Sequence, residues 1–483
     1  MQYRSIIRIL GLLIAIFSIT MIPPAFVALG YNDGAGVPFL LSFLLCLFIG
    51  FIIWYPHRKH RAELKVRDGF LIVALFWIVL GAVGAIPLML ATNPSLSLAS
   101  AMFEAFSGLT TTGATVLTGI EYLPKAILYY RAQLQWLGGM GIIVLAVAIL
   151  PMLGVGGMQL YRAETPGPVK DNKMTPRIAD TAKHLWYIYL ALTIACSVAF
   201  YAAGMNAFDA ICHAFATIAI GGFSTYDASM GYFQSPLINA ICVIFLLISA
   251  VNFPLHFAAM RGKSVSVYFR DPEFKAFLLL QGLLVFICFV VLLKTNTYDS
   301  AADALSHGSF QAVSIATTAG FSTVSFAAWP LFLPILLIFF SFVGGCAGST
   351  GGGLKVVRVV LLFLQGKREL NRLIHPRAVY AIKLGRRAVP DRVVEAIWGF
   401  FAAYALVFVV IMLLLMATGL DSVTAFTATA ACLNNLGPGL GEVAAHYGTI
   451  PDLSKWLLIT AMVFGRLEIF TLLVLFTPTF WRD

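Results

Sequence analysis

Charged residues are scarce in this chain of 483 residues: Asp, Glu, Lys and Arg together make up 11% of it, whereas hydrophobic residues make up 60%. Soluble globular proteins carry roughly 25% charged residues, so the composition excludes that class. The hydrophobic blocks also lack the alternating pattern of an outer-membrane barrel strand, which leaves helices as the way across a membrane. The composition therefore predicts an all-α polytopic membrane protein.

Motifs of catalysis and of metal binding are missing as well. The chain has no HExxH or GxSxG motif and no paired membrane aspartates, so we do not expect an enzyme. The seven cysteines contain no CxxC pair, and we expect buried thiols that act as small hydrophobic residues. The histidines show no ligand spacing, and we expect His213 and His307 to pack or to form hydrogen bonds. We expect the chain to bind no cofactor of its own.

Ten hydrophobic blocks are long enough to cross a bilayer, which takes about 20 residues of helix. The first block follows Met1 but continues through Pro23 and Pro24 without a convincing small-x-small cleavage site, so we expect a retained span and not a secretory signal. The expected spans are 5–30, 38–55, 69–91, 136–153, 184–204, 237–258, 275–294, 330–364, 393–418 and 455–478.

Positive charge is distributed unevenly between alternate loops. The net charge is +10, and segment 355–392 is the richest in Lys and Arg, whereas neither occurs between Lys183 and Arg261. By the positive-inside rule this asymmetry predicts that both termini are cytoplasmic. Most of the excess charge therefore reflects topology, and we expect no nucleic-acid partner. The loops on the outer side carry only Lys125, Arg131, Lys294 and Lys455.

Segment 355–392 supports two interpretations that the sequence leaves open. Its basic, partly helical character suits a cytosolic protein partner or the anionic headgroups of membrane lipids. It is equally compatible with an orientation signal alone.

The outer loops share one pattern, in which a short, semi-apolar stretch leads into a polar turn that contains glycine. The four turn glycines lie roughly 100 residues apart, with one span before each turn and one after it. We therefore predict four fused span–pore loop–span repeats in pseudo-fourfold symmetry, with ten transmembrane helices and four re-entrant pore helices. The glycines are Gly113, Gly222, Gly320 and Gly437. The expected units are two extra N-terminal helices at 1–68 and repeats at 69–183, 184–274, 275–392 and 393–483.

Four such turns favour a single cation pore over ordinary external loops. A helix that enters the membrane only half-way is tolerated where it lines a watery cavity. Glycine allows backbone angles that turn consecutive carbonyls toward one axis, where they replace the hydration shell of an ion. An acidic residue near each helix start would suit the positive end of the helix dipole; these residues are Glu104, Asp209, Asp303 and Asp421. The expected selectivity-filter residues are Thr111, Thr112, Gly113, Ile220, Gly221, Gly222, Thr318, Ala319, Gly320, Asn435, Leu436 and Gly437.

A glycine run at 344–353 interrupts the eighth block. It holds six glycines in ten residues, which cannot maintain a continuous helix because each costs about 1 kcal/mol relative to alanine. No strand precedes the run and no Lys-Ser or Lys-Thr follows it, so a phosphate-binding loop is rejected. We interpret it as a flexible intramembrane loop beneath the third turn, with a helix break for close packing as the alternative. The expected gate residues are Gly344, Gly345, Gly348, Ser349, Thr350, Gly351, Gly352 and Gly353.

Arg466 is a second gate candidate, because it lies in the middle of the last block. A buried charge costs at least ~2.5–3.5 kcal/mol and needs a partner or water. Glu468 lies two residues further on and points to a different helix face, so an automatic pair is not expected. We predict that Arg466 faces the pore below the filter and acts as an electrostatic barrier to cations. An interhelical structural pair is the alternative.

Together these features resemble the membrane subunit of Trk-type potassium uptake systems, in the Trk/Ktr/HKT superfamily, over essentially the whole chain. The most specific marks are the single-glycine turns Thr112-Gly113-Ala114-Thr115, Gly222-Phe223-Ser224-Thr225, Gly320-Phe321-Ser322-Thr323 and Leu436-Gly437-Pro438-Gly439. The resemblance implies a fold like four fused potassium-channel subunits, a homodimer and a cytosolic nucleotide-binding ring as regulatory partner. It also implies that the glycine run is the gating loop and that an arginine occupies the fourth-repeat helix.

The function implied by the resemblance is gated potassium uptake across the bacterial inner membrane. Glycine at all four key positions implies a preference for potassium, with rubidium also passing. The single glycine departs from the Thr-Val-Gly-Tyr-Gly of tetrameric potassium channels, so passage of sodium stays open. A symporter that couples potassium to protons or sodium is the alternative, although the sequence lacks a chain of intramembrane carboxylates for a proton relay.

Overall fold

The computed structural model describes residues 1–60, 65–141, 178–378, 380–385 and 387–482. Within these residues the regular structure is helical, apart from one hairpin in which β1 (Lys383–Leu384) pairs antiparallel with β2 (Arg387–Ala388). The expected all-α architecture is confirmed for the described part of the chain.

Six helical segments of the described chain are long and apolar enough to cross a membrane, and each coincides with an expected span. The first runs from α1 through a 3-10 turn into α2. In order they are α1 (Tyr3–Ser18) with α2 (Ile22–Tyr31), α3 (Gly36–Trp54), α4 (Val66–Leu90), α10 (Ile178–Ala202), α15 (Pro272–Lys294) and α19 (Asp391–Ala417).

The expected span 237–258 is wrong as a continuous helix. It divides into α12 (Pro236–Ser249) and α13 (Phe253–Gly262), which are bent by 91°. Pro254 lies in the first turn of α13 and has no N–H to donate to a preceding turn, so a new helix begins there.

The expected span 455–478 is likewise not one continuous helix. It divides into α21 (Asp452–Arg466) and a segment that begins with α22 (Phe470–Leu473), with a bend of 107°. The φ angles of Glu468 and Ile469 are 54° and 50°, which a right-handed helix does not allow. The C-terminal α23 (Pro478–Trp481) follows.

The remaining two expected spans are also interrupted or incompletely described. Block 330–364 contains α17 (Leu333–Ser341) and the start of α18 (Val356–Ile374), and the chain between them is not helical, as the glycine run predicts. Helix α6 (Lys125–Gly139) includes the start of the expected span 136–153, most of which lies outside the described residues.

Four short helices precede the glycine turns, where the pore helices are expected. Each begins after a side chain that accepts a backbone N–H, which satisfies a donor that the first helical turn leaves free. The helices, with their capping residues, are α5 (Leu98–Leu109; Ser97), α11 (Ala207–Ile218; Asn206), α16 (Ala301–Ala316; Ser300) and α20 (Ser422–Leu433; Asp421).

The acidic residues expected at the helix starts are found there in three of the four cases. Asp209 and Asp303 lie in the first turns of α11 and α16, and Asp421 caps α20. The hydrogen bonds from Thr424 hold the pKa of Asp421 below its usual value. The expectation is wrong for Glu104, which lies in the middle of α5 and is fully buried, because it pairs with a cation from α6.

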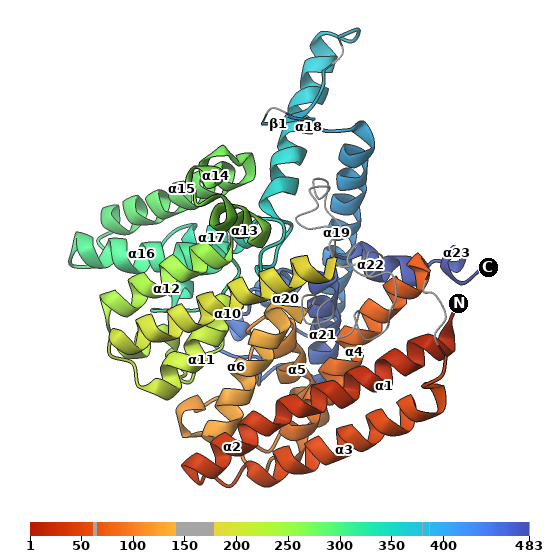
Figure 1. The fold of residues 1–483 in the computed structure, drawn as a ribbon. Helices are drawn as coiled ribbons and strands as arrows, with labels where there is room; N and C mark the ends of the chain where they lie inside the picture. Colours follow the sequence, from red (N-terminus) through yellow and green to blue (C-terminus); the bar gives the residue numbers. More distant parts are fainter. Residues whose placement is uncertain (61–64, 142–177, 379, 386, 483) are drawn as a thin grey trace.

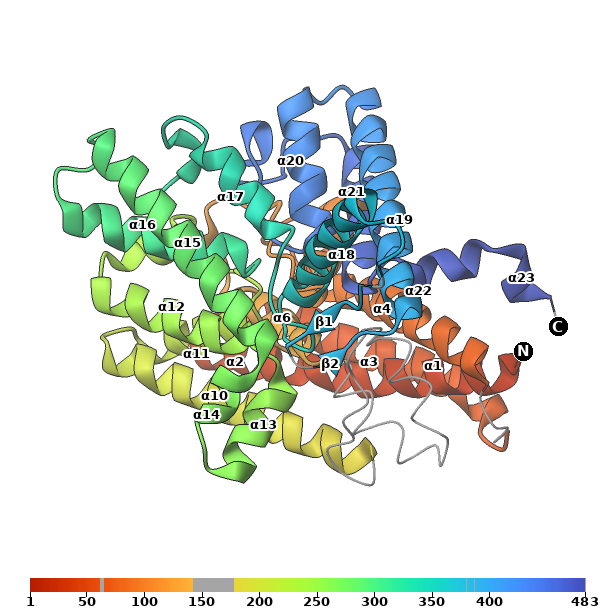
Figure 2. The same ribbon diagram turned by 90° about the horizontal axis from the view of Figure 1, so that it is seen from above.

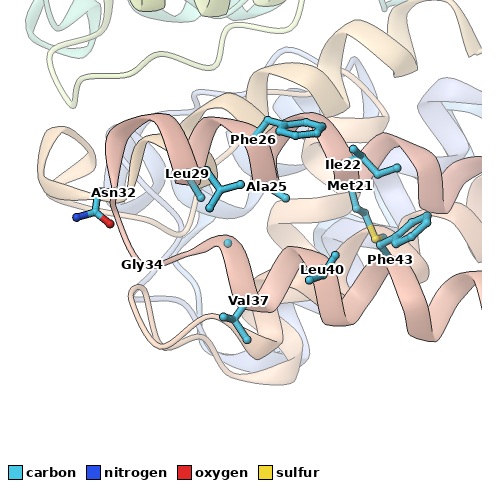
Figure 3. Close-up of a pocket in the computed structure, with 12 residues that line it drawn as sticks. Met21, Ile22, Ala25, Phe26, Leu29, Asn32, Gly34, Val37, Leu40 and Phe43 are labelled. Atoms are coloured by element: carbon cyan, nitrogen blue, oxygen red, sulfur yellow. The ribbon is translucent and has the colours of Figure 1, made fainter.

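The N-terminal helices pack against the first repeat. Figures 1 and 2 show α1 and α3 side by side along one flank, with α4 behind them. A Cβ atom on Gly11 would lie 2.6 Å from the backbone nitrogen of Trp54, so the two helices approach through small residues. Between α2 and α3 lies a groove of about 440 Å³, lined by apolar side chains such as Phe26, Leu29 and Val37 (Figure 3). Such a surface suits contact with lipid hydrocarbon.

The two chain ends lie close together (Figures 1 and 2). The backbone N–H of Gln2 donates to Asp68 Oδ1 at 3.1 Å, and Arg67 Nη1 donates to the carbonyl of Phe480 at 3.3 Å. Both termini therefore lie at the same end of α4. Helix α18 and the β1–β2 hairpin project from the body of the molecule (Figure 1).

Candidate functional site

The four glycine turns share one backbone conformation. The residue two places before each glycine has a positive φ angle, which costs a non-glycine residue about 1–3 kcal/mol. A strained conformation at four equivalent places indicates that the surrounding structure imposes it. The φ angles are 56° at Thr111, 54° at Ile220, 70° at Thr318 and 54° at Asn435, followed by 80°, 79°, 79° and 100° at Gly113, Gly222, Gly320 and Gly437.

Each turn is tied to its short helix by the same hydrogen bond. The residue before the glycine donates its backbone N–H to a carbonyl in the last turn and a half of the helix, which would otherwise lack a partner. These bonds are Thr112 to Ser107 (2.8 Å), Gly221 to Ala216 (2.8 Å), Ala319 to Ser314 (2.7 Å) and Leu436 to Ala431 (2.7 Å).

The turns lie against one another in cyclic order. A Cβ atom on Gly113 would overlap the carbonyl oxygen of Gly221, and a Cβ on Gly437 would lie 2.7 Å from the carbonyl oxygen of Thr112. The two remaining junctions repeat this overlap, between Gly222 and Ala319 and between Gly320 and Leu436. The four turns therefore form one closed ring of backbone. We call it the turn ring, and it comprises 111–113, 220–222, 318–320 and 435–437.

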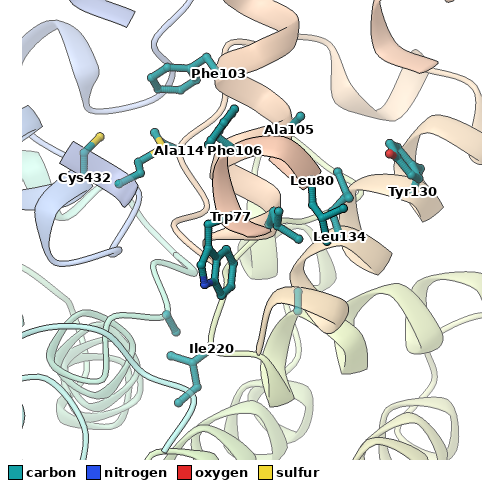
Figure 4. Close-up of a cluster of buried hydrophobic side chains, with 14 of the residues drawn as sticks. Trp77, Leu80, Phe103, Ala105, Phe106, Ala114, Tyr130, Leu134, Ile220 and Cys432 are labelled. Atoms are coloured by element: carbon teal, nitrogen blue, oxygen red, sulfur yellow. The ribbon is translucent and has the colours of Figure 1, made fainter. Parts of the chain in front are cut away.

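All the residues expected at the filter lie in the turn ring, and its non-glycine members are buried. Behind the first turn, Phe106, Leu80 and Trp77 form part of a buried hydrophobic cluster, and Ile220 of the second turn lies near Trp77 (Figure 4). The first two turns of the ring therefore pack against buried hydrophobic side chains.

Polar side chains of the short helices hold the chain that follows each glycine. His213 Nε2 is hydrogen-bonded to Ser224 Oγ (3.0 Å), and His307 Nδ1 to Thr323 Oγ1 (2.9 Å). The expectation of hydrogen-bonding histidines is confirmed, and no cluster of three metal-ligating side chains occurs in the described residues. Thr427 Oγ1 accepts the backbone N–H of Leu440 (2.9 Å) in the fourth repeat.

In the first repeat, a buried ion pair holds the chain that follows the glycine. Arg131 Nε donates to Glu104 Oε1 at 2.7 Å, and the two side chains are 1% and 0% exposed. The sequence places Arg131 among the charges of the outer loops, and this is wrong, because Arg131 lies inside α6 and faces the core. The sequence signal that could have identified it is a cation among apolar residues on the face of α6 that also carries Gln135.

Two further polar residues that sequence reasoning missed contact the ring. Gln135 Nε2 donates to the Gly221 carbonyl (2.6 Å), and its Oε1 accepts the backbone N–H of Phe223 (3.0 Å). Tyr447 Oη donates to the Gly437 carbonyl (2.8 Å), and its backbone N–H donates to the carbonyl of Thr115 (2.7 Å). Tyr447 therefore connects the fourth turn to the first.

The irregular chain between α17 and α18, residues 342–355, lies against the turn ring, and we call it the glycine loop. The N–H of Gly352 donates to Thr318 Oγ1 (2.7 Å), and the N–H of Gly353 donates to the carbonyl of Asn434 (3.1 Å). Thr350 Oγ1 donates to the carbonyl of Ile218 (3.0 Å). The loop thus touches the third turn, as the sequence predicts, and also the second and fourth repeats.

Glu273 of α15 connects the glycine loop to the start of α18. Its Oε1 accepts the backbone N–H groups of Ala347 (2.7 Å) and Val357 (3.2 Å). The side chain is buried, and sequence reasoning missed it because it stands at the start of a span among charged loop residues.

Arg466 ends α21 next to the turn ring and the glycine loop. Its Nη1 donates to the carbonyl of Thr350 (3.2 Å) and to Thr111 Oγ1 (3.4 Å), and its Nη2 donates to the carbonyl of Gly138. The carboxylate of Glu468 pairs with Arg358 of α18. The guanidinium therefore lies where the first repeat, the fourth repeat and the glycine loop meet.

The chemistry available at the ring is that of oxygen donors. The ring consists of backbone carbonyls from all four turns together with the threonine side chains of two of them, and the C-terminal ends of the four short helices, which carry partial negative charge, adjoin it. Such a set suits a weakly hydrated cation. The described residues bring no cluster of thiolate, imidazole or carboxylate ligands to the ring.

Comparisons with known proteins agree with this architecture. The family model TrkH, described as "Cation transport protein", matches residues 36–482. The chain is 67% identical over 485 residues to the Trk system potassium uptake protein TrkH of Vibrio parahaemolyticus, and 63% identical over 483 residues to TrkH of Escherichia coli K12, with 100% of each chain covered. The crystal structure of the potassium transporter TrkH from Vibrio parahaemolyticus superimposes with a TM-score of 0.91 at 64% identity, again over 100% of both chains.

Proposed function

This chain belongs to the TrkH family of cation transport proteins, and we propose that it takes up potassium across the bacterial inner membrane through a pore formed by the turn ring. The observation that carries the proposal is the closure of the ring, in which each turn glycine lies against the carbonyl of the next turn. Four pieces of chain from distant parts of the sequence meet in this way only if they surround a common axis.

Potassium passes the ring by exchanging water for protein oxygens. The filter residues named above offer carbonyl groups, and Thr111, Thr112 and Thr318 add hydroxyls. Glycine is needed at 113, 222, 320 and 437 because a side chain would overlap the neighbouring carbonyl. Rubidium, which is similar in size, passes as well, and the single glycine of each turn leaves some passage of sodium.

The glycine loop and Arg466 form the gate. Both contact the ring, at Thr318 and Thr111 respectively, and are joined by the hydrogen bond from Arg466 Nη1 to the Thr350 carbonyl. A cation that leaves the ring meets the guanidinium charge, so opening requires the loop and Arg466 to move apart. Residues 344–353, with six glycines, allow this movement because their backbone is less restricted than that of other residues.

Ten spans and four re-entrant pore helices complete the proposed architecture, with the unit boundaries predicted from the sequence and both termini in the cytoplasm. Proximity of the two chain ends supports a common side for them. The projecting α18, with its basic residues, is the surface that a cytosolic nucleotide-binding ring would contact. A homodimer and surrounding membrane lipids are the further partners.

Coupling of potassium to protons or to sodium is the alternative mechanism. The buried carboxylates near the ring are committed to donors: Glu104 to Arg131, and Asp209 to Thr225 and Tyr226. Carboxylates held in this way do not favour a proton relay. Reversal potentials measured with and without a sodium or pH gradient distinguish the two mechanisms, because only coupled transport follows the second gradient.

Rubidium uptake into liposomes that contain the purified protein tests the proposal. We expect uptake above that of protein-free liposomes, suppressed by external potassium more than by sodium. Gly113→Ala should reduce uptake about 10-fold or more, because its Cβ would overlap the Gly221 carbonyl and disturb the ion ligands. Gly282→Ala is the matched control, since nothing lies within 4 Å of a Cβ there. Equal uptake by the native protein and Gly113→Ala would refute the ring as the conducting path.

A further inference from the structure

We propose that the buried pair Glu104–Arg131 positions the chain that follows Gly113 and Gly222, and thereby determines how strongly the pore distinguishes potassium from sodium. The inference rests on the proposed function, since it assigns a specificity role within the same pore. Neither residue belongs to the turn ring itself, so the pair acts through the backbone that it holds.

Both members of the pair are bound to the two turns. Glu104 accepts the Thr115 hydroxyl on both carboxylate oxygens (3.0 Å each) and the backbone N–H of Val116 (3.0 Å). Arg131 Nη2 donates to the same Thr115 hydroxyl (3.1 Å), and its Nη1 donates to the carbonyl of Ser224 (3.2 Å). The pair therefore connects the first turn to the second.

The connection lies at the same level of both turns. Thr115 and Ser224 each stand two residues after the turn glycine, and Gly113 itself lies against the carbonyl of Gly221. The Arg131 guanidinium also stacks over the ring of Phe223 at 4.2 Å, which fixes its plane. Displacement of either ion would move both turns together.

The position of Glu104 is used differently in each repeat. The residue at the same distance before the turn glycine is His213 in the second repeat, Gln311 in the third and Ala428 in the fourth. His213 bonds to Ser224 and Gln311 donates to the carbonyl of Val324, whereas alanine has no polar group. At this position the support behind the ring is thus ionic in the first repeat, whereas in the fourth repeat the hydrogen bond to the chain after the glycine is made by the neighbouring Thr427.

A rigid junction matters for selection between ions. Discrimination by ligand spacing requires that the oxygens do not close around the smaller sodium ion. A buried, hydrogen-bonded ion pair has one favourable geometry, because any displacement leaves a charge without its partner in an apolar interior. Of the four positions behind the ring, the first is therefore the best suited to resist contraction.

The experiment compares rubidium and sodium uptake in liposomes for the native protein and three variants. Glu104→Gln leaves the cation without its anion, and Arg131→Met leaves the anion without its cation. The double variant Glu104→Gln/Arg131→Met leaves no unpaired buried charge and is the best suited of the three to fold. Glu369→Gln, the same chemical change in a half-exposed pair with Arg372 on α18, is the matched control.

We expect the ratio of rubidium to sodium uptake to fall about threefold or more in the double variant and in both single variants, and to stay unchanged in Glu369→Gln. A role through charge alone would move the two single variants in opposite directions and leave the double variant like the native protein, and that result would overturn the proposal. Thr115→Val removes the hydroxyl shared by both ions and keeps both charges, so an unchanged ratio in this variant also overturns it. Absence of rubidium uptake by the native protein would instead remove the proposed function on which the inference rests.

Discussion

Arg466 brings a positive charge to the point where the first repeat, the fourth repeat and the glycine loop meet, next to the turn ring. The sequence identified it because a charge in an apolar block is rare and needs a reason. Its partners could not be predicted from the sequence. They are the backbone carbonyls of Gly138 and Thr350, which belong to other repeats and do not depend on the type of side chain.

Arg466→Ala should raise the resting uptake of rubidium several-fold, because the variant removes both the charge beneath the ring and the hydrogen bond to Thr350. Arg466→Lys keeps the charge but not the planar fork of donors, so we expect it to retain most of the barrier. Uptake at constant protein content is the measurement. An unchanged or lower rate in Arg466→Ala would remove the barrier role.

Glu104 shows the limit of sequence reasoning for a single residue. Its position ahead of a glycine turn suggested a helix start, but Ser97 caps α5 and places Glu104 in the second turn. Helix boundaries depend on caps that several residue types can provide, whereas burial depends on neighbours from distant segments. Gln135 and Tyr447 were not predicted because their contacts with the ring are made to distant segments of the chain.

Among the helices, the second helix of every repeat ends close to the ring. The last residues are Gly139 in α6, Ser249 in α12, Ser341 in α17 and Arg466 in α21. Of the interruptions that follow α12, α17 and α21, only the one after α17 could be predicted, because six glycines mark it in the sequence. The interruption after α12 depends on one proline, and the one after α21 depends on two residues with positive φ angles. A hydropathy profile detects neither of them.

Glu273→Gln should loosen the glycine loop. The side-chain oxygen of the introduced glutamine can still accept both N–H groups, which Glu273 binds through Oε1 alone, but an amide oxygen is a weaker acceptor than a carboxylate oxygen, and the amide group places donors where the second carboxylate oxygen lies. We expect faster hydrogen exchange in residues 347–357 and a resting rubidium uptake raised about twofold or more.

Glu369→Gln again provides the control for this prediction, since its carboxylate is half-exposed on α18. Faster exchange without any change in uptake would mean that the loop is anchored by Glu273 but does not close the pore.

On the scale of the whole molecule, the sequence predicted much of the arrangement. Regular recurrence of glycine turns indicated the fourfold plan because such a repeat reflects packing around one axis. Membrane orientation rests on the distribution of Lys and Arg alone, and the structure adds the proximity of the two termini.

Cysteine labelling tests the orientation. All seven native cysteines are buried, so a membrane-impermeant maleimide should react with them only weakly. Tyr122→Cys and Leu373→Cys introduce thiols at positions that are 83% and 80% exposed. In intact spheroplasts we expect the thiol at 122 to react and the thiol at 373 to react only in inverted vesicles. Labelling of both from the same side would invalidate the predicted topology.

The four turns of the ring belong to one chain, which has a consequence for how the proposed pore can change. In an assembly of four identical subunits, one mutation changes the same residue in every subunit at once. The assembly must therefore tolerate that change at four places. Here each quadrant is encoded separately, so a mutation perturbs a single side of the opening and leaves the other three as they were. Divergence such as Pro438 after the fourth glycine, or the ionic support behind the first, is therefore open to selection one side at a time.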